Sequence, residues 1–99
     1  MPNWQNKQTD DLCAAILALQ SLSEARNFLR DLMTEKELME FGKRWQAAQM
    51  LNKNVPYTEI QTKLGLSSTT IARIAKWLNN GMGGYKKSIN KLNNHHRST

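Results

Sequence analysis

The chain has 99 residues, enough for one domain or one protomer of an oligomer but too few for a large core. The single cysteine, Cys13, excludes an internal disulfide and a cysteine-based zinc site, and we expect it to be a buried, inert thiol. No apolar run approaches the ~18 residues of a membrane span, and no cleavable signal pattern occurs. We therefore expect a cytoplasmic protein with no membrane partner.

The net charge of +6 is unevenly distributed along the chain. Residues 1–40 carry four basic and seven acidic side chains, a net of −3. Residues 41–99 carry ten basic side chains against Glu59 alone, a net of +9. The basic part is typical of a surface that binds nucleic-acid phosphates, whereas the acidic part is better suited to assembly.

The N-terminal third predicts two amphipathic helices. Residues 10–22 place Leu12, Ile16, Leu19 and Leu22 on one face, with Asp10 and Asp11 near the helix start. This face is wide and strongly apolar for a surface helix, so a partner chain could cover it. Residues 23–33 predict a second helix, capped by Ser23 and buried through Ala25, Phe28, Leu29 and Leu32.

A third helix is predicted from a capping box. Thr34 precedes Glu37 by three residues, and each side chain can satisfy a backbone amide at the helix start. The helix continues to about Leu51 and has an apolar side through Leu38, Phe41, Trp45 and Ala48. Asn52 to Val55 forms a turn, and Pro56 suits the start of the next helix. Trp45, and Trp77 further on, are expected in the core or at an interface.

Residues 57–79 predict a helix-turn-helix. Helices at 57–64 and 67–79 are joined by Gly65, and their apolar positions are Ile60, Leu64, Leu66, Ile71 and Ile74. The outer face of the second helix carries small hydroxyl groups followed by cations, which suits a DNA major groove and its phosphates. The alternative is an ordinary helical hairpin. The candidate DNA contacts are Thr58, Gln61, Ser67, Ser68, Thr69, Ala72, Arg73 and Lys76.

Two of these roles stay open at this point. Ser67 can be only an N-cap, because capping and DNA contact compete for the same hydroxyl. Arg73 and Lys76 are phosphate contacts or solvated surface cations. Ser68, Thr69 and Ala72 are the better candidates for reading bases, because a recognition helix enters the groove by this end.

The C-terminal part predicts a stop and a last helix. Glycines among residues 81–84 end the previous helix, and a phosphate-cradling loop is disfavoured because no strand precedes them. Residues 85–92 predict a helix, and residues 93–99 a flexible tail. His95 and His96 have no nearby ligand partner, so we expect no metal. No catalytic set of side chains is apparent, and we expect neither an enzyme nor a cofactor.

The segment from about Leu32 to Leu92 resembles the tryptophan repressor (TrpR-like) superfamily. The strings GLSSTTIARIAKWL and MTEKELMEFGKRWQAAQMLN carry the resemblance, and the closing LNNGMGGYKKSINKL favours its YerC/YecD-type branch. The resemblance implies an all-α fold of about six helices over residues 1–99. It also implies an intertwined homodimer, with residues 10–51 in dimerisation and two recognition helices in successive major grooves.

The resemblance also assigns a tryptophan pocket, and the match is partial. The pocket's threonine corresponds to Thr34, and the two arginines that sandwich the indole correspond to Arg44 and Arg73. Ile74 replaces the glycine that makes room for the ring in the sensing repressor. Overfilling a cavity commonly costs ~1–3 kcal/mol, so we expect a vestigial pocket and no tryptophan binding.

The sequence therefore predicts a homodimeric, sequence-specific transcriptional regulator, most simply a repressor, that binds double-stranded DNA without tryptophan as corepressor. One alternative is a helix-turn-helix accessory protein of a mobile element. Another is a protein-interaction adaptor that binds no specific DNA site. The salt dependence and sequence preference of DNA binding distinguish these possibilities.

Overall fold

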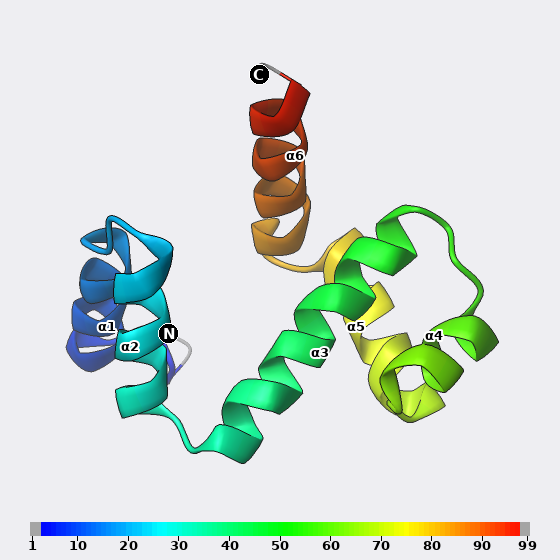
Figure 1. Cartoon of the computed structure of the whole chain (residues 1–99), viewed down its shortest axis with the longest axis horizontal. Coiled ribbons are helices and arrows are strands. Elements are labelled where there is room, and N and C mark those ends of the chain that lie inside the picture. The colour runs from blue at the N-terminus through cyan, green and yellow to red at the C-terminus, as the bar shows by residue number, and fades with distance from the viewer. Residues whose placement is uncertain (1–2, 98–99) are drawn as a thin grey trace. The chain divides into compact units, whose positions relative to one another are not determined.

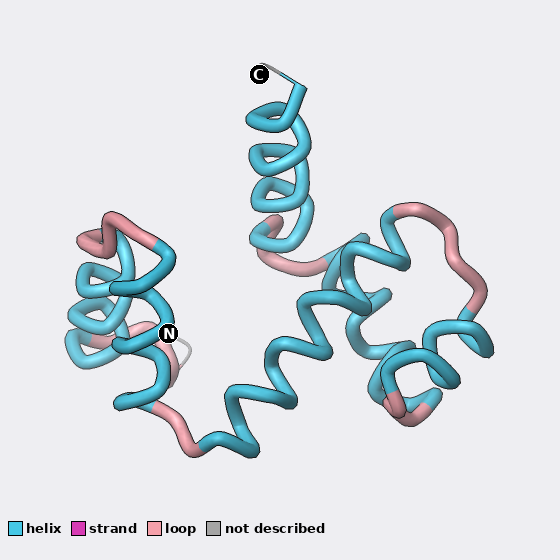
Figure 2. Tube along the Cα trace, viewed as in Figure 1, coloured by secondary structure: helices cyan, strands magenta, loops and turns pink. Residues whose placement is uncertain are grey.

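The computed structural model describes the backbone of residues 3–97 and the side chains of residues 3–94. That part of the chain forms six α-helices and no strand, which confirms the all-α prediction (Figures 1 and 2). The helices are α1 (Lys7–Leu17), α2 (Leu22–Leu32), α3 (Glu35–Asn52), α4 (Tyr57–Leu64), α5 (Ser68–Asn80) and α6 (Gly84–Arg97). The chain divides into two compact units, residues 1–38 and 39–99. The expected single domain over residues 1–99 stays a prediction.

The first unit differs from the prediction in its helix boundaries. Helix α1 starts earlier than the predicted 10–22, because the Asn6 side chain accepts a hydrogen bond from the Thr9 backbone N–H at 2.9 Å. The cap of α2 is Ser21, and the prediction of Ser23 is wrong. Ser21 Oγ accepts from the Glu24 N–H at 3.0 Å, while the Glu24 carboxylate accepts from the Gln20 N–H at 2.8 Å. Helix α1 ends at Leu17 with Ala18 as its C-cap, short of the predicted end at Leu22.

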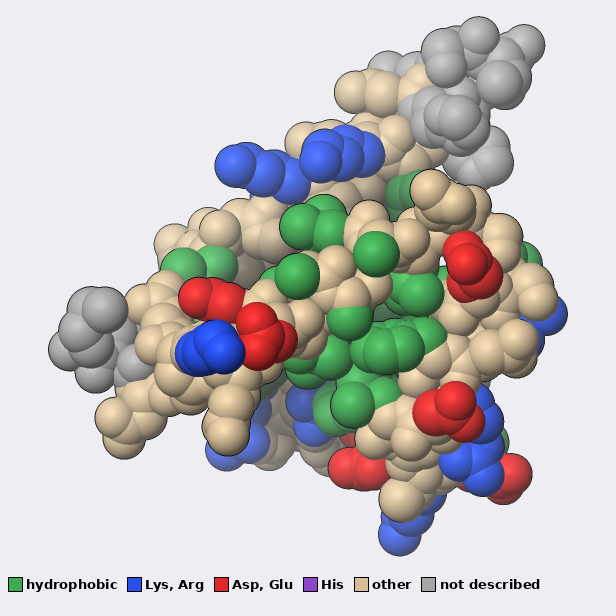
Figure 3. Space-filling view, turned by 90° about the vertical axis from the view of Figure 1, so that its left-hand side faces the viewer, with side chains coloured by type: hydrophobic (Ala, Val, Ile, Leu, Met, Phe, Trp, Pro, Cys, Tyr) green, Lys and Arg blue, Asp and Glu red, His purple; other side chains and the backbone are tan. Residues whose placement is uncertain are grey.

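No residue of α1 or α2 is buried. Leu17 is 85% exposed and Leu22 is 73% exposed, and other apolar side chains are also open at the surface (Figure 3). Cys13 is exposed as well, so the expectation of a buried thiol is wrong for the single chain. Two 11-residue helices with no interior of their own are at the lower limit of helix stability, and a further surface is needed to cover them.

The core lies in the second unit. It is built from small side chains of α3, aliphatic side chains of α4 and α5, and one residue of α6: Ala47, Ala48, Ile60, Leu66, Ile71, Ile74, Leu78 and Ile89. The alanines allow close helix contact on the α3 side, and Ile60, Ile71 and Ile74 fill the space between α4 and α5. This core fixes the geometry of residues 57–80.

Two further expectations concern helix ends. The capping box of α3 is confirmed: Thr34 Oγ1 accepts from the Glu37 N–H at 3.1 Å, and the Glu37 carboxylate accepts from the Thr34 N–H at 3.0 Å. The predicted tail 93–99 is wrong for residues 93–97, which continue α6. No glycine or proline interrupts this stretch, so the helix carries on past Leu92. The side chains of His95 and His96 lie outside the described residues.

None of the described helices is long and apolar enough to span a membrane.

Candidate nucleic-acid interface

A tight corner between α4 and α5 organises the candidate site. Gly65 ends α4 with φ +69° and ψ +25°, a left-handed conformation that favours glycine. Its N–H donates to the Gln61 carbonyl at 2.8 Å. Leu66 follows and is buried at the angle between the two helices. The predicted corner is therefore present, and it directs the start of α5 outward from the core.

Helix α5 has two distinct faces. Ile71, Ile74 and Leu78 are buried, which fixes the helix on the rest of the second unit. The opposite face is open to solvent and carries five of the predicted contacts: Ser68, Thr69, Ala72, Arg73 and Lys76. Within the described residues, neither cation is in an ion pair. Their charges are therefore free to meet phosphate.

Ser67 is the N-cap of α5. Its Oγ accepts a hydrogen bond from the Thr70 N–H at 3.1 Å and donates to Thr70 Oγ1 at 3.0 Å. Ser67 therefore serves as the N-cap, the role that the sequence left open. Its hydroxyl oxygen retains one lone pair that could accept a hydrogen bond from DNA. Ser68 and Thr69, one and two residues further on, are exposed, and the structure gives their hydroxyls no partner among the described side chains.

Helix α4 presents its first turn to solvent. Thr58 is exposed there, while Gln61 is partly buried one turn later. Pro56 precedes the helix and provides no side-chain cap. The backbone N–H groups of Tyr57 and Thr58 therefore have no acceptor within the helix, since the Pro56 carbonyl receives those of Glu59 and Ile60.

The residues of the expected tryptophan pocket are differently engaged. Thr34 caps α3 in the first unit. In the second unit, Arg44 pairs with Glu40 (Nε to Oε2, 3.5 Å), and its guanidinium lies 5.5 Å from the centre of the Phe41 ring. The Nε atom is buried and has no hydrogen-bond partner among the described residues. Arg73 is exposed, whereas Ile74 is completely buried in the core.

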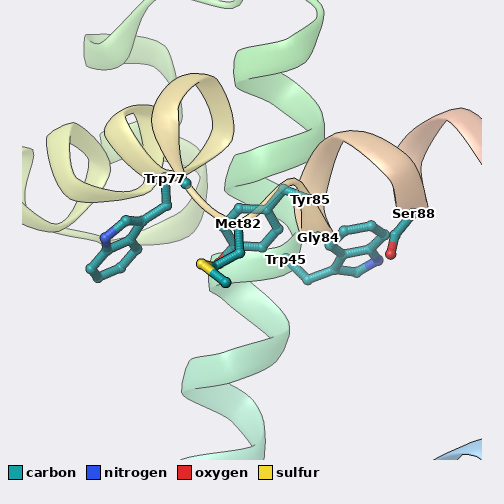
Figure 4. Close-up of a pocket in the computed structure, with 7 residues that line it drawn as sticks. Trp45, Trp77, Met82, Gly84, Tyr85 and Ser88 are labelled. Carbon is teal, nitrogen blue, oxygen red and sulfur yellow. The ribbon is translucent and has the colours of Figure 1, made fainter. Parts of the chain in front are cut away.

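Sequence reasoning missed an aromatic hollow of about 560 Å³ between α3, α5 and α6 (Figure 4). Trp45 and Tyr85 stack there, with ring centres 6.2 Å apart and planes inclined by 24°. Trp77 is 46% exposed and Met82 is 81% exposed, so the core position expected as one option for Trp77 is wrong and the interface position stays a prediction. Trp45 and Tyr85 are 40 positions apart in the sequence, so no local pattern predicts this pairing.

A second, more polar hollow of about 390 Å³ was also missed. It lies where the end of α3, the start of α4, the end of α5 and the start of α6 meet. Its polar side chains are Asn52, Asn54, Tyr57, Asn79 and Lys86. A signal was present in the sequence, because Asn79 follows Ala72 by seven residues and so extends the same face of α5.

A fixed corner followed by a helix with a free polar and cationic face defines the chain as an all-α helix-turn-helix protein. Comparison with known proteins then places it more closely. The sequence profile of the Trp repressor protein family matches residues 7–93, and the chain belongs to this family.

Two relatives agree with this assignment. The chain is 33% identical over 88 residues to the uncharacterized protein YerC of Bacillus subtilis, covering 89% of this chain and 85% of that protein. It is also similar to the crystal structure of a TrpR-like protein from Eubacterium eligens, with a TM-score of 0.86 and 33% identity. That match covers 91% of this chain and 93% of the other. The predicted YerC-type branch is confirmed.

Proposed function

We propose that the protein is a homodimeric, sequence-specific DNA-binding regulator of transcription, most simply a repressor, acting in the cytoplasm without tryptophan as corepressor. The observation that carries this proposal is the division of α5 into a buried face and a free face. Ile71 and Ile74 hold the helix, while Ser68, Thr69 and Ala72 stand open at its N-terminal end. A helix held in this way can place that end against base edges in a major groove.

The charges around the helix support DNA as the partner. After Glu59 the sequence contains no acidic residue, while Arg73 and Lys76 stand exposed on α5. The free amides at the start of α4 add a positive helix end beside Thr58. The short side chains on α5 favour modest sequence selectivity, partly through bridging water.

The uncovered apolar surfaces support a dimer. Leu17, Leu22 and Leu32 are exposed in the first unit, and Trp77 and Met82 in the second. Apolar groups of this size gain about 1.5–3 kcal/mol each when fully removed from water, so a second copy would be stabilised by covering them. An intertwined arrangement, in which the helices of two chains interlock, provides such a cover.

The absence of a tryptophan response is supported by Ile74 and Arg44. Ile74 fills part of the core, and Arg44 is already engaged with Glu40 and Phe41. Helix α5 is thus held by core packing and needs no ligand to position it.

Selection of bound duplexes from a random DNA pool tests the proposal, with light scattering to measure the mass in solution. We expect a dimer and a palindrome with half-sites about one DNA turn apart. A variant with Leu17→Asp and Leu22→Asp should be monomeric, whereas Gln20→Asp, which adds charge in the same segment, should stay dimeric. Weak binding with no preferred site would support the adaptor alternative and contradict the proposal.

A further inference from the structure

The polar hollow between α4 and α6 has the composition of an anion site. Its lining combines hydrogen-bond donors with apolar side chains and contains no acid: Leu51, Asn52, Asn54, Val55, Pro56, Tyr57, Ala75, Leu78, Asn79 and Lys86. Lys86 is the one cation among them. A lone ammonium beside neutral amides favours an anion that accepts several hydrogen bonds.

Lys86 is held at the edge of this hollow by contact with α3. Its Nζ lies 3.4 Å from Oδ1 of Asn52, at the last residue of that helix. This contact uses one of the three donors of the ammonium group and leaves two. Asn79 donates one amide hydrogen to the Ala75 carbonyl at 2.9 Å and keeps the other. The hollow therefore retains several donors for a ligand.

The position of the hollow connects it with the candidate DNA surface. Ala72, Lys76 and Asn79 are spaced by four and three residues on α5, so they share one face of the helix. Asn79 lines the hollow at the far end of that face. Tyr57, on another wall, directly precedes Thr58 in the first turn of α4. The hollow is thus bounded by the two helices that carry the predicted contacts.

We propose that this hollow seats a backbone phosphate of the bound DNA, with Lys86 as its counter-charge, so that α6 takes part in DNA binding. Asn54, Asn79 and the Tyr57 hydroxyl provide the remaining donors. Val55, Pro56 and Leu78 give an apolar floor that suits the adjoining deoxyribose. A hollow of about 390 Å³ is larger than a phosphate group alone and fits this larger unit. The inference rests on the proposed function.

The test compares charge-matched variants on one helix. DNA affinity is measured by fluorescence anisotropy on the selected duplex between 50 and 200 mM salt, for Lys86→Gln and for Lys91→Gln, which lies outside the hollow. The salt slope is the slope of log affinity against log salt concentration, and losing one phosphate contact reduces its size by about 0.9. Between 50 and 200 mM salt, the affinity of Lys86→Gln should therefore fall about 3.5-fold less than that of the parent. Lys91→Gln should match the parent, and Lys86→Arg should restore the slope.

The outcomes separate the two proposals. The phosphate seat is overturned if the salt dependence of DNA affinity changes equally in Lys86→Gln and Lys91→Gln, or does not change in Lys86→Gln. In either case, specific DNA binding by the parent protein still upholds the proposed function. No DNA binding by the parent overturns both. Titration with inorganic phosphate, followed by NMR of the Asn54 and Asn79 side-chain amides, distinguishes the source of the anion. Saturation at low millimolar phosphate together with an unchanged Lys86→Gln slope would assign the hollow to a free anion and overturn the inference.

Discussion

Arg73 and Ile74 are neighbours on α5, yet one side chain is exposed and the other completely buried. In the pocket that the family resemblance implies, both positions would face a ligand. In this chain only the arginine is open to a partner, because the isoleucine packs with Ile60 and Ile71 in the core. The two positions therefore serve different purposes, and their substitutions should separate stability from binding.

Truncating Ile74 should destabilise the second unit. Ile74→Ala removes buried methyl groups from a packed core, and we expect a loss of about 2–5 kcal/mol in the free energy of unfolding. Ile74→Val should cost only about 0.5–1.5 kcal/mol. Urea unfolding followed by circular dichroism measures both. Ile74→Gly should also loosen the helix-turn-helix and weaken DNA binding, and an unchanged affinity in that variant would count against packing as the support of α5.

Tryptophan should not bind at micromolar concentration. The position that would hold the ring is occupied by a core side chain, and displacing it requires opening the contact between α4 and α5. Isothermal titration of the purified protein with tryptophan provides the measurement. A saturable heat with micromolar affinity would show that the pocket is functional, and would refute this part of the proposed function.

Arg73 should contribute to DNA binding but not to folding. Because its side chain is exposed, Arg73→Gln should change the free energy of unfolding by less than about 0.5 kcal/mol. It should weaken DNA binding and reduce the salt slope by about 0.9. Lys36→Gln removes the same charge from the acidic part of the chain and serves as control. Equal effects of both substitutions would indicate a response to net charge rather than a phosphate contact.

Gly65 should tolerate asparagine better than alanine. Its φ of +69° disfavours a residue with a Cβ by about 1–2 kcal/mol, although no atom lies within 4 Å of the Cβ that alanine would add. Gly65→Ala should therefore lower the free energy of unfolding through the backbone alone. Gly65→Asn should lower it less, because asparagine visits the left-handed region more readily. Equal losses in the two variants would point to packing instead.

The start of α3 should respond to acid. Hydrogen bonds from the Thr34 backbone and side chain lower the pKa of Glu37 below its ordinary value of 4.5. The ionised carboxylate therefore stabilises the cap above about pH 4.5, and this contribution is lost as pH falls through the lowered pKa. An NMR pH titration of Glu37 should show the lowered midpoint. Glu37→Gln can keep the capping geometry without titrating, so its cap should be insensitive to acid over this range.

The features that the sequence predicted correctly are those formed by residues close together in the chain. Thr34 and Glu37 lie three residues apart, and Gly65 stands between two helical patterns, so each feature was complete within a few residues. The cap of α2 was harder, because Ser21 and Ser23 both precede the same apolar run. The spacing of Ser21 and Glu24, three residues as for Thr34 and Glu37, is the signal that favours Ser21 as the cap.

The second hollow was signalled by Asn79 alone, because its other lining residues come from distant parts of the chain. Lys86 and Asn52 are 34 residues apart and meet only because α5 and α6 pack as they do. The sequence did place Lys86 in a basic region, but charge alone did not distinguish it from Lys87 or Lys91. Contact with a residue on another helix is what singles it out.

Because the helices of the first unit have no fully buried residue, we expect the concentration of the protein to govern its activity. Helices α1 and α2 have no fully buried residue within the chain, so a surface that covers them should stabilise them. If that surface belongs to a second copy, the concentration of complete dimers rises with the square of the monomer concentration as long as most chains are monomers. DNA binding by such a regulator would rise steeply once its concentration approaches the dissociation constant of the dimer, and dilution alone would abolish it.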